Sequence, residues 1–388
     1  MQAEDKLILA SVKIQPGVAE LEQLNDLIPQ IRDWDYVVKT SIDRGIGPLL
    51  SKKLPLLRNN PQIPAHVKTK LQQAYYKTFS RSALLYEYFK KVAEALALHN
   101  IEVIALKGIY LSEWLYEDIG LRQFSDMDLL VREEDGPQCL AILAGMGFRP
   151  CDSSVSEFIG AHAEVVHYTP MVRNDVSVEI HIKLHRKDKN YCINIHEFIE
   201  NAVPVTLNDV QVKALCLPDL MIHLCVHVDK HFRGGHVQFT SFNDIVNLLD
   251  KYRDEIKWPE FIKATRYHKC EEVVFKYLLL VNKYFQAPLP VLVQKCYPHL
   301  LTEEDEELFY NYLKGHVLTK YHVTTHWQNM SEIGSLGNKA RYFAELIFPP
   351  KKFMLEKYGI RHPSLFMFYY PYRYWVGVKG IFKIMVND

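Results

Sequence analysis

The sequence lacks the features that mark membrane-spanning, secreted and disulfide-bonded proteins. No stretch approaches the roughly 18 consecutive apolar residues of a transmembrane helix. Residues 1–13 have no basic start, no long apolar centre and no small-residue cleavage site, so no signal peptide is expected. The seven cysteines are scattered, odd in number and never spaced as Cys-x-x-Cys. Free thiols in a cytoplasmic protein are therefore expected.

An excess of charge of one sign is also missing, and so are the commonest catalytic motifs. Lys plus Arg and Asp plus Glu number 46 each in 388 residues, which argues against indiscriminate binding to bulk nucleic acid. The sequence has no Gly-x-Ser-x-Gly nucleophile motif, no P-loop and no glycine-rich dinucleotide fingerprint. With 48% hydrophobic and 24% charged residues, the composition is that of a globular protein with a large core.

Hydrophobic spacing divides the chain into three predicted parts and indicates an α+β fold. Steps of three and four between apolar residues run through 63–100 and predict a long amphipathic helix, just after a proline-rich stretch. Helical patterns resume from Pro218. We therefore predict a helical N-terminal subdomain at 1–98, an α/β core with a mixed sheet at 99–215, and a helical C-terminal domain at 216–388.

The central part is predicted to alternate between strands and helices. Its β-branched and apolar runs indicate strands at 101–106, 126–131, 164–169 and 176–184, with helices at 109–118 and 133–146 between the first of them. The last two strands are expected to pair as a hairpin around Arg173-Asn174-Asp175.

Acidic side chains gather on one surface of this expected sheet. Because alternate residues of a strand share a face, Asp126 and Asp128 point away from the buried side of their strand. Glu179 and His181 share the polar face of 176–184. If the two strands are neighbours, three carboxylates converge on a site for Mg²⁺ or Mn²⁺. Two such ions about 4 Å apart can clamp a phosphoryl group. The alternative is a solvated face of a half-exposed sheet.

A glycine-containing turn follows the first strand. Lys107-Gly108 opens a helix, where free backbone N–H groups hold an anion and glycine permits close approach. Lys107 can pair with a phosphate through its single positive charge, and the guanidinium of Arg122 can donate two parallel hydrogen bonds to triphosphate oxygens. The alternatives are an ordinary turn, and an ion pair from Arg122 to Glu117, Asp118 or one of the paired aspartates.

These residues lie within a string that resembles a known family. Residues 106–131, LKGIYLSEWLYEDIGLRQFSDMDLLV, resemble the signature of an uncharacterised bacterial nucleotidyltransferase family of the DNA polymerase beta-like superfamily. That signature is an LKG turn, a helix, a Gly-x-Arg step and a D-x-D-x-L-V strand. Glu179-Ile180-His181 resembles its later E-x-H strand, and residues 218–231 and 242–249 resemble its helical blocks. The resemblance runs from about residue 30 to the end.

The resemblance implies a minimal nucleotidyltransferase fold with an acidic metal site. By position, Asp126 and Asp128 would hold two Mg²⁺ ions, and Glu179 would hold one of them and accept the proton of the attacking hydroxyl. Where the superfamily has a Gly-Ser pair at the nucleotide phosphates, this chain has Lys107-Gly108 followed by Ile109. Taking the residue patterns and the resemblance together, the expected nucleotide-binding residues are Lys107, Gly108, Arg122, Ser125, His227 and His231.

Three histidines form the other notable pattern. His223, His227 and His231 are four residues apart and share one face of a predicted helix. One metal ion does not suit all three, because the outer two are about 12 Å apart along the helix. A polar face lining the nucleotide cleft is favoured, with ordinary helix packing as the alternative. His181 is expected to relay a proton or orient Glu179, or else to be a hydrogen-bonded residue of the sheet.

The C-terminal stretch at 361–382 combines many aromatic side chains with several basic ones. This mixture suits a membrane interface, a nucleic-acid stack or a partner groove. A tail packed back on the helical domain is the favoured alternative, because apolar tails usually pack.

Together these features predict an enzyme. It moves NMP from an NTP, with ATP the expected nucleotide, to a hydroxyl-type acceptor and releases pyrophosphate, with Mg²⁺ or Mn²⁺ as cofactor. A small molecule or a protein is favoured over RNA as the acceptor, because the net charge is zero. The alternatives are a non-catalytic nucleotide-binding sensor or scaffold, and a metal-dependent phosphohydrolase built on the histidine helix.

Overall fold

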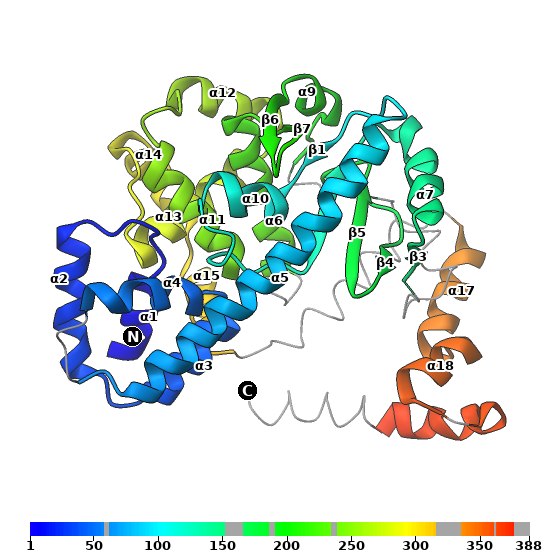
Figure 1. The fold of residues 1–388 in the computed structure, drawn as a ribbon, viewed down its shortest axis with the longest axis horizontal. Coiled ribbons are helices and arrows are strands. Elements are labelled where there is room, and N and C mark those ends of the chain that lie inside the picture. The colour runs from blue at the N-terminus through cyan, green and yellow to red at the C-terminus, as the bar shows by residue number, and fades with distance from the viewer. Residues whose placement is uncertain are drawn as a thin grey trace.

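The computed structural model describes residues 1–57, 62–151, 166–185, 191–233, 239–315, 335–360 and 362–375 (Figure 1). Within these ranges helices flank one mixed sheet, as the predicted α+β class requires. One hydrophobic core extends from Leu7 to Leu313 and includes residues of all three predicted parts. The division at 98 and 215 stays a prediction.

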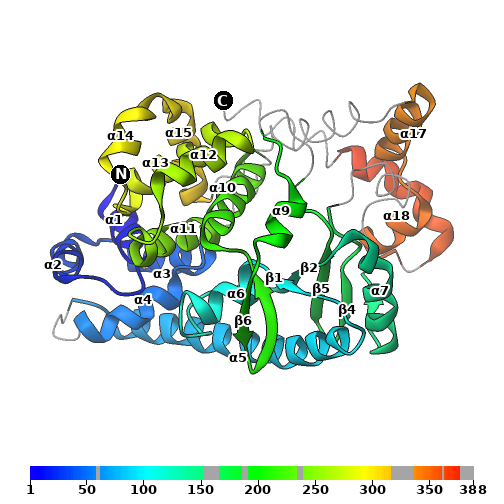
Figure 2. The ribbon, with the colours of Figure 1, turned by 90° about the horizontal axis from the view of Figure 1, so that it is seen from above.

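The N-terminal helices lead into one long helix that supports the sheet. They are α1 (Ala3–Ala10), α2 (Val18–Leu27), η1 (Ile28–Gln30), α3 (Trp34–Asp43), α4 (Gly47–Lys53), η2 (Leu54–Leu57) and α5 (Ala65–Ala97). The 33-residue helix α5 follows Pro64, whose extended backbone precedes the first helical turn, and it confirms the helix predicted at 63–100. It crosses one face of the sheet and contacts β2, β5 and β7 (Figure 2).

A buried lysine at the end of α4 gives a prediction about stability. The side chain of Lys53 is fully buried, and within the described ranges its Nζ has one hydrogen bond, to the carbonyl oxygen of Leu49 at 3.5 Å. Burial lowers the pKa of Lys53 from its usual 10.5 to about 7. At pH values below this folded-state pKa, Lys53 is charged in the folded protein, and burial of the charge lowers the stability by its full amount. That cost falls as pH rises toward 10.5, because the folded state releases a proton that the unfolded chain keeps.

We therefore expect Lys53→Met to stabilise the protein by on the order of 3 kcal/mol near pH 7, and by about half as much near pH 9. Urea unfolding at both pH values measures this change. The control is Lys52→Met, because Lys52 is half exposed and its replacement should change stability by less than about 0.5 kcal/mol. An unchanged stability of Lys53→Met at the lower pH would mean that the buried ammonium is not a burden.

In the described parts of the chain, seven strands form the sheet in the order β3-β4-β5-β2-β1-β7-β6. The strands are β1 (Ile104–Ala105), β2 (Asp126–Leu130), β3 (Arg149–Pro150), β4 (Met171–Arg173), β5 (Val176–His181), β6 (Val203–Leu207) and β7 (Val210–Ala214). Pairs β2–β5 and β1–β7 are parallel and the others antiparallel. The helices of this region are α6 (Lys107–Trp114), η3 (Glu133–Asp135), α7 (Gly136–Gly145) and α9 (Ile195–Glu200).

The strand predictions need two corrections. The hairpin strand directly before the turn Asn174-Asp175 is β4 at 171–173, which was not predicted. Of the predicted strand 164–169, residues 164 and 165 lie outside the described residues, and His167 forms an isolated antiparallel bridge with His181 at the end of β5. Both turn residues have positive φ, at 48° and 63°, as a two-residue hairpin turn requires. The hairpin of β6 and β7 was missed, although Asn208-Asp209 repeats the same signal with φ of 46° and 63°.

Helices of the second half follow the sheet; the first of them lies on the face opposite α5, and those up to Lys314 complete the core. They are α10 (Leu217–Arg233), α11 (Phe239–Tyr252), α12 (Trp258–Tyr267), α13 (Glu271–Phe285), α14 (Val291–Cys296), η4 (Pro298–Leu300) and α15 (Glu303–Lys314), followed by α17 (Leu336–Ile347), α18 (Lys351–Tyr358) and η5 (Pro363–Phe368). Helix α10 packs against α11 and α13. In Figure 2 the sheet lies between α5 on one side and α10 on the other.

Two further sequence expectations concern the cysteines and membrane-spanning helices. All seven cysteines lie within the described residues and are free thiols, as expected. Among the helices that the structure describes, none combines the length and apolar character needed to cross a bilayer. The described part of the C-terminal stretch, 362–375, packs on neighbouring residues of the predicted helical C-terminal domain, where Tyr370 and Tyr374 donate to the carbonyl oxygens of Pro349 and Ile347. It contributes no residue to the main core and exposes several of its large side chains.

Candidate active site

The three predicted carboxylates lie together on the face of the sheet that is turned toward α10. Asp126 and Asp128 are on β2 and Glu179 is on the adjacent parallel strand β5, where Asp128 is directly opposite Glu179. The alternate residues Met127 and Leu129 are fully buried on the other face, so the pleat turns the acids away from the core.

Arg81 of α5 helps to fix this arrangement from outside the site. Its guanidinium donates to the carbonyl oxygens of Ser125 and Asp175, both at 2.8 Å. These residues directly precede β2 and β5, so one side chain joins the starts of the two acidic strands.

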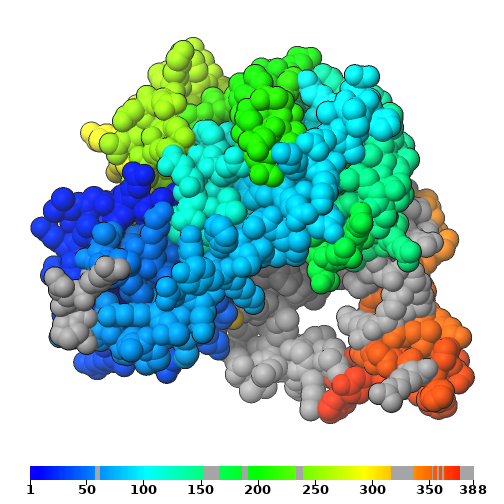
Figure 3. Space-filling model, viewed as in Figure 1, coloured from blue at the N-terminus to red at the C-terminus, as the bar shows by residue number. Residues whose placement is uncertain are grey.

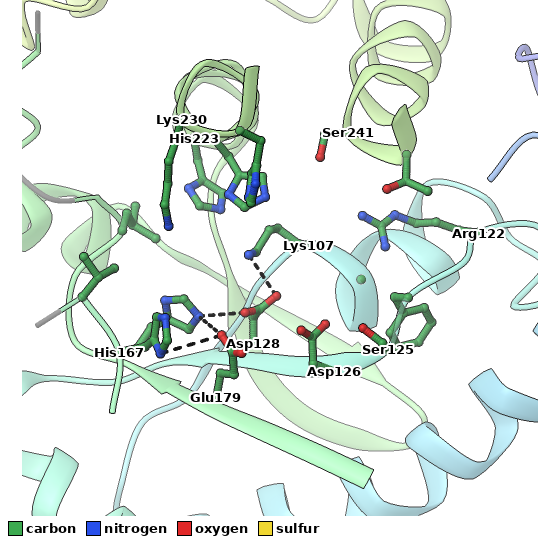
Figure 4. A pocket seen from close by; sticks show the side chains of 18 of the residues that line it. Lys107, Arg122, Ser125, Asp126, Asp128, His167, Glu179, His223, Lys230 and Ser241 are labelled. Atoms are coloured by element: carbon green, nitrogen blue, oxygen red, sulfur yellow. Dashed lines mark hydrogen bonds and ion pairs between the residues drawn. The ribbon is translucent and has the colours of Figure 1, made fainter. Parts of the chain in front are cut away.

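Asp128 is held between a lysine and a histidine (Figure 4). Its Oδ2 is 3.0 Å from Lys107 Nζ, and its Oδ1 is 2.7 Å from His181 Nε2. The same His181 nitrogen is 3.5 Å from Glu179 Oε2, and His167 Nδ1 is 3.9 Å from that oxygen. Lys107 and His181 therefore orient Asp128, and the two histidines flank Glu179.

The two aspartates of β2 have opposite electrostatic environments. Burial, together with the charges of Asp128 and Glu179, raises the pKa of Asp126 to about 6. Burial also acts to raise the pKa of Asp128, but the ammonium of Lys107 and the hydrogen bond to His181 outweigh it and hold that pKa far below its usual range. Asp126 forms no ion pair with any residue in the described ranges, so the negative charges of Asp128 and Glu179 disfavour its ionised form.

This donor set fits a divalent cation. One ligand atom each from Asp128, Glu179 and His181 lie within 4.8 Å of one another. The carboxylate of Asp126, with its raised pKa, adds a partly buried oxygen donor without a countercharge. Carboxylate oxygens suit Mg²⁺ and Mn²⁺, whereas an imidazole nitrogen is accepted more readily by Mn²⁺ or Zn²⁺ than by Mg²⁺.

The turn at Lys107-Gly108 begins α6 beside this cluster. Lys107 has a φ of +40°, which is uncommon for a residue with a side chain. A Cβ on Gly108 would lie 2.7 Å from the side chain of Phe124. The structure therefore requires glycine here for the packing of Phe124, whether or not a phosphate approaches its backbone.

Arg122 lines the cleft but is paired with a residue that the sequence analysis did not consider. Its Nε and one terminal nitrogen donate to the two carboxylate oxygens of Asp244 on α11, at 2.8 and 2.7 Å. Tyr116 also donates to Asp244, at 2.9 Å. All three side chains are buried, and the ion pair joins the loop before β2 to α11. The partner is neither Glu117, Asp118 nor an acid of the cluster.

The histidine face of α10 forms the opposite wall of the cleft. His223 and His227 are buried and His231 is partly exposed, and Figure 4 shows His223 and Lys230 facing the acidic strands. Burial and nearby cations, first of all Lys107, hold the pKa values of His223 and His227 well below the usual range, so both imidazoles are neutral. Among the described residues, these three histidines form no metal-binding group of three.

The cleft between these walls has a volume of about 490 Å³. Every residue predicted from the sequence to belong to the site lines it: Lys107, Gly108, Arg122, Ser125, Asp126, Asp128, Glu179, His227 and His231. It is also lined by residues that the sequence analysis missed, among them His167, Thr240 and Ser241. No sequence motif includes these three residues. The bridge to His181 places His167 at the cleft, and the start of α11 places Thr240 and Ser241 there.

Comparison with known proteins identifies the family of the chain. No curated protein sequence matches the chain. A family profile described as an uncharacterised nucleotidyltransferase matches residues 30–286, which is most of the chain but ends before the C-terminal region to which the sequence resemblance was extended. The chain therefore belongs to this family of uncharacterised nucleotidyltransferases.

Proposed function

We propose that this nucleotidyltransferase moves NMP from an NTP, with ATP as the expected nucleotide, to a hydroxyl-type acceptor in a reaction that needs a divalent cation. The observation that carries this proposal is the convergence of Asp126, Asp128 and Glu179 in one cleft of a chain that belongs to a nucleotidyltransferase family. In the reaction, an acceptor oxygen forms a bond to the α-phosphorus, the bond from that phosphorus to the β-phosphate oxygen breaks, and pyrophosphate leaves.

The cation, Mg²⁺ or Mn²⁺, would be held by Asp126, Asp128 and Glu179, and when bound it supplies positive charge against the phosphate oxygens. Lys107 and His181 keep Asp128 ionised and oriented. Although burial acts to raise the pKa of Glu179, its contacts with His181 and His167 hold it below the usual value. Glu179 is therefore ionised at neutral pH and can accept the proton of the acceptor hydroxyl.

The rest of the cleft is proposed to bind the nucleotide. Ser125 lies beside Asp126 (Figure 4). The Lys107-Gly108 turn, and His227 and His231 of α10, line the same cleft. Neutral imidazoles donate and accept single hydrogen bonds without adding charge. We propose that these histidines contact the base or ribose, while the β2 side of the cleft holds the phosphates.

Transfer of label tests the proposal. The pure protein is incubated with each NTP, radiolabelled at the α-phosphate, with Mg²⁺ or Mn²⁺ and with or without cell extract. We expect label to move to an acceptor only when metal is present and to be lost on adding EDTA and in Glu179→Gln. The control Glu134→Gln changes an exposed acid outside the cleft and should leave transfer unchanged.

The outcomes separate the proposed enzyme from its alternatives. Metal-dependent binding of NTP without transfer, even with extract, would favour a nucleotide sensor. Release of labelled nucleotide to water that depends on His227 but not on Asp128 would favour a phosphohydrolase. The chemical nature of the labelled product distinguishes a small molecule, a protein and an RNA as acceptor.

A further inference from the structure

The C-terminal part of the chain, defined here as the arm and comprising 335–360 and 362–375, stands outside the main core. The core takes its members from Leu7 to Leu313, and no described residue of the arm belongs to it. Within the arm Tyr342, Met354 and Ile360 are buried. Figure 3 shows it at the edge of the molecule, on the side away from α1–α4.

The arm exposes two apolar stripes. On α17 the stripe consists of Leu336, Ala340, Phe343 and Ala344, at the spacing of one helical face, and Leu336 is 86% exposed. The second stripe follows η5 into the helical residues 369–375 and consists of Leu365, Phe368, Tyr372 and Trp375, again at steps of three and four; Phe368 is 76% exposed. An exposed apolar face of this size marks a contact surface rather than ordinary surface composition.

Charge separates the arm from the rest of the chain. Residues 335–388 carry nine Lys and Arg but only three Asp and Glu, out of 46 of each kind in the whole sequence. The C-terminal segment therefore has a formal charge of +6 and residues 1–334 have −6. Basic side chains of the arm, such as Lys351, which lies over the ring of Phe366, stand beside the exposed aromatic ones.

We propose that the arm docks the protein on the surface of an anionic lipid bilayer. Exposed Leu, Phe and Trp side chains between basic residues are the composition of segments that lie in the bilayer interface, and Tyr and Trp suit its polar–apolar boundary. The charge difference gives the docking a direction, because an anionic surface attracts the arm and repels the remainder of the chain. Phosphocholine lipids have no net charge, so they would bind the apolar stripes but would not attract the basic side chains.

Docking does not depend on the proposed function. The arm contributes no residue to the cleft, and it lies beyond the part that matches the nucleotidyltransferase family. Membrane binding can therefore be present in a variant without activity, and activity in a variant that does not bind.

Vesicle flotation with the full-length protein tests the proposal. We expect the protein to float with vesicles of phosphatidylcholine and phosphatidylglycerol in low salt, and to be released by high salt, which screens surface charge. Lys339→Glu and Lys351→Glu should each weaken binding by at least about fivefold, the effect of one basic charge near the surface. Phe343→Gln/Phe368→Gln should weaken it by about tenfold or more, because two buried aromatic contacts are lost.

The matched control makes the same change on the body of the protein. Leu98 and Val291 are as exposed as the arm residues, at 84% and 61%, so Leu98→Gln/Val291→Gln should float like the wild type. Absence of flotation with anionic vesicles would overturn the proposal, as would equal flotation of the arm and control variants. So would an arm-dependent dimer, seen by sedimentation, that does not bind vesicles, because the stripes would then be a protein contact.

Discussion

Asp126→Asn is expected to abolish nucleotidyl transfer and at the same time to stabilise the fold. The cation would lose one of its proposed ligands, and the rate of transfer should fall by about a thousandfold or more. Stability should rise, because Asp126 is partly buried beside two other acids that raise its pKa to about 6. The gain is roughly 1 to 2 kcal/mol at neutral pH, after allowance for partial exposure.

Asp128→Asn should abolish transfer with the opposite effect on stability. This carboxylate is buried and accepts from both Lys107 and His181, so its neutralisation leaves the partly buried ammonium of Lys107 without a countercharge. A loss of about 2 to 3 kcal/mol is expected. The effect on stability therefore depends on which of the two aspartates carries the ion pairs.

Urea unfolding and label transfer on the same samples measure the two effects. An opposite sign of the stability changes in the two variants, with activity lost in both, is the signature of a site whose acids are assembled for a cation rather than for the fold. Retained metal-dependent transfer in both variants would rule out the proposed mechanism. Equal destabilisation by both would instead mean that Asp126 has a stabilising partner.

Asp244→Asn is expected to be the most destabilising single change near the cleft, at about 3 to 5 kcal/mol. It removes the countercharge of a buried guanidinium, while the amide oxygen still accepts the hydrogen bond from Tyr116. The double variant Arg122→Met/Asp244→Asn should recover part of this loss, because the unpaired charge is gone. A double-mutant cycle by urea unfolding measures the coupling, expected at about 2 kcal/mol or more.

The same cycle separates the two roles of Arg122. If its function is to hold α11 against the loop before β2, the double variant regains nucleotide affinity together with stability. If Arg122 also contacts the triphosphate, as the sequence predicts, the folded double variant binds NTP at least about tenfold more weakly than the wild type. Additive stability losses without coupling would contradict the ion pair itself.

Local patterns made much of this protein predictable from its sequence. The helix at 65–97 follows from the spacing of its apolar residues, and the helix that begins at Glu303 follows from Thr302, which forms a capping box with Asp305. The strand period alone placed Asp126 and Asp128 on one face. The β6–β7 hairpin was equally local and could have been predicted from its Asn-Asp turn.

Contacts between distant segments were beyond the sequence. The pairing of Arg122 with Asp244 joins residues 122 positions apart, and no periodicity marks which buried acid a given arginine meets. The need for glycine at 108 comes from Phe124, packed against it across a loop. The exposure of the arm was also not predictable, because composition tells that a segment is apolar and basic but not whether the core has room for it.

The sequence by itself determined the chemistry of the site: the carboxylates, the turn at Lys107-Gly108 and the histidine face are set by residue type and by the periods of strand and helix. The tertiary structure decided that β2 and β5 are parallel neighbours, that Lys107 and His181 pair with Asp128 rather than with Asp126, and that α10 faces them. The physical reason is that periodicity is a property of one segment, whereas pairing, burial and charge environment depend on which segments meet.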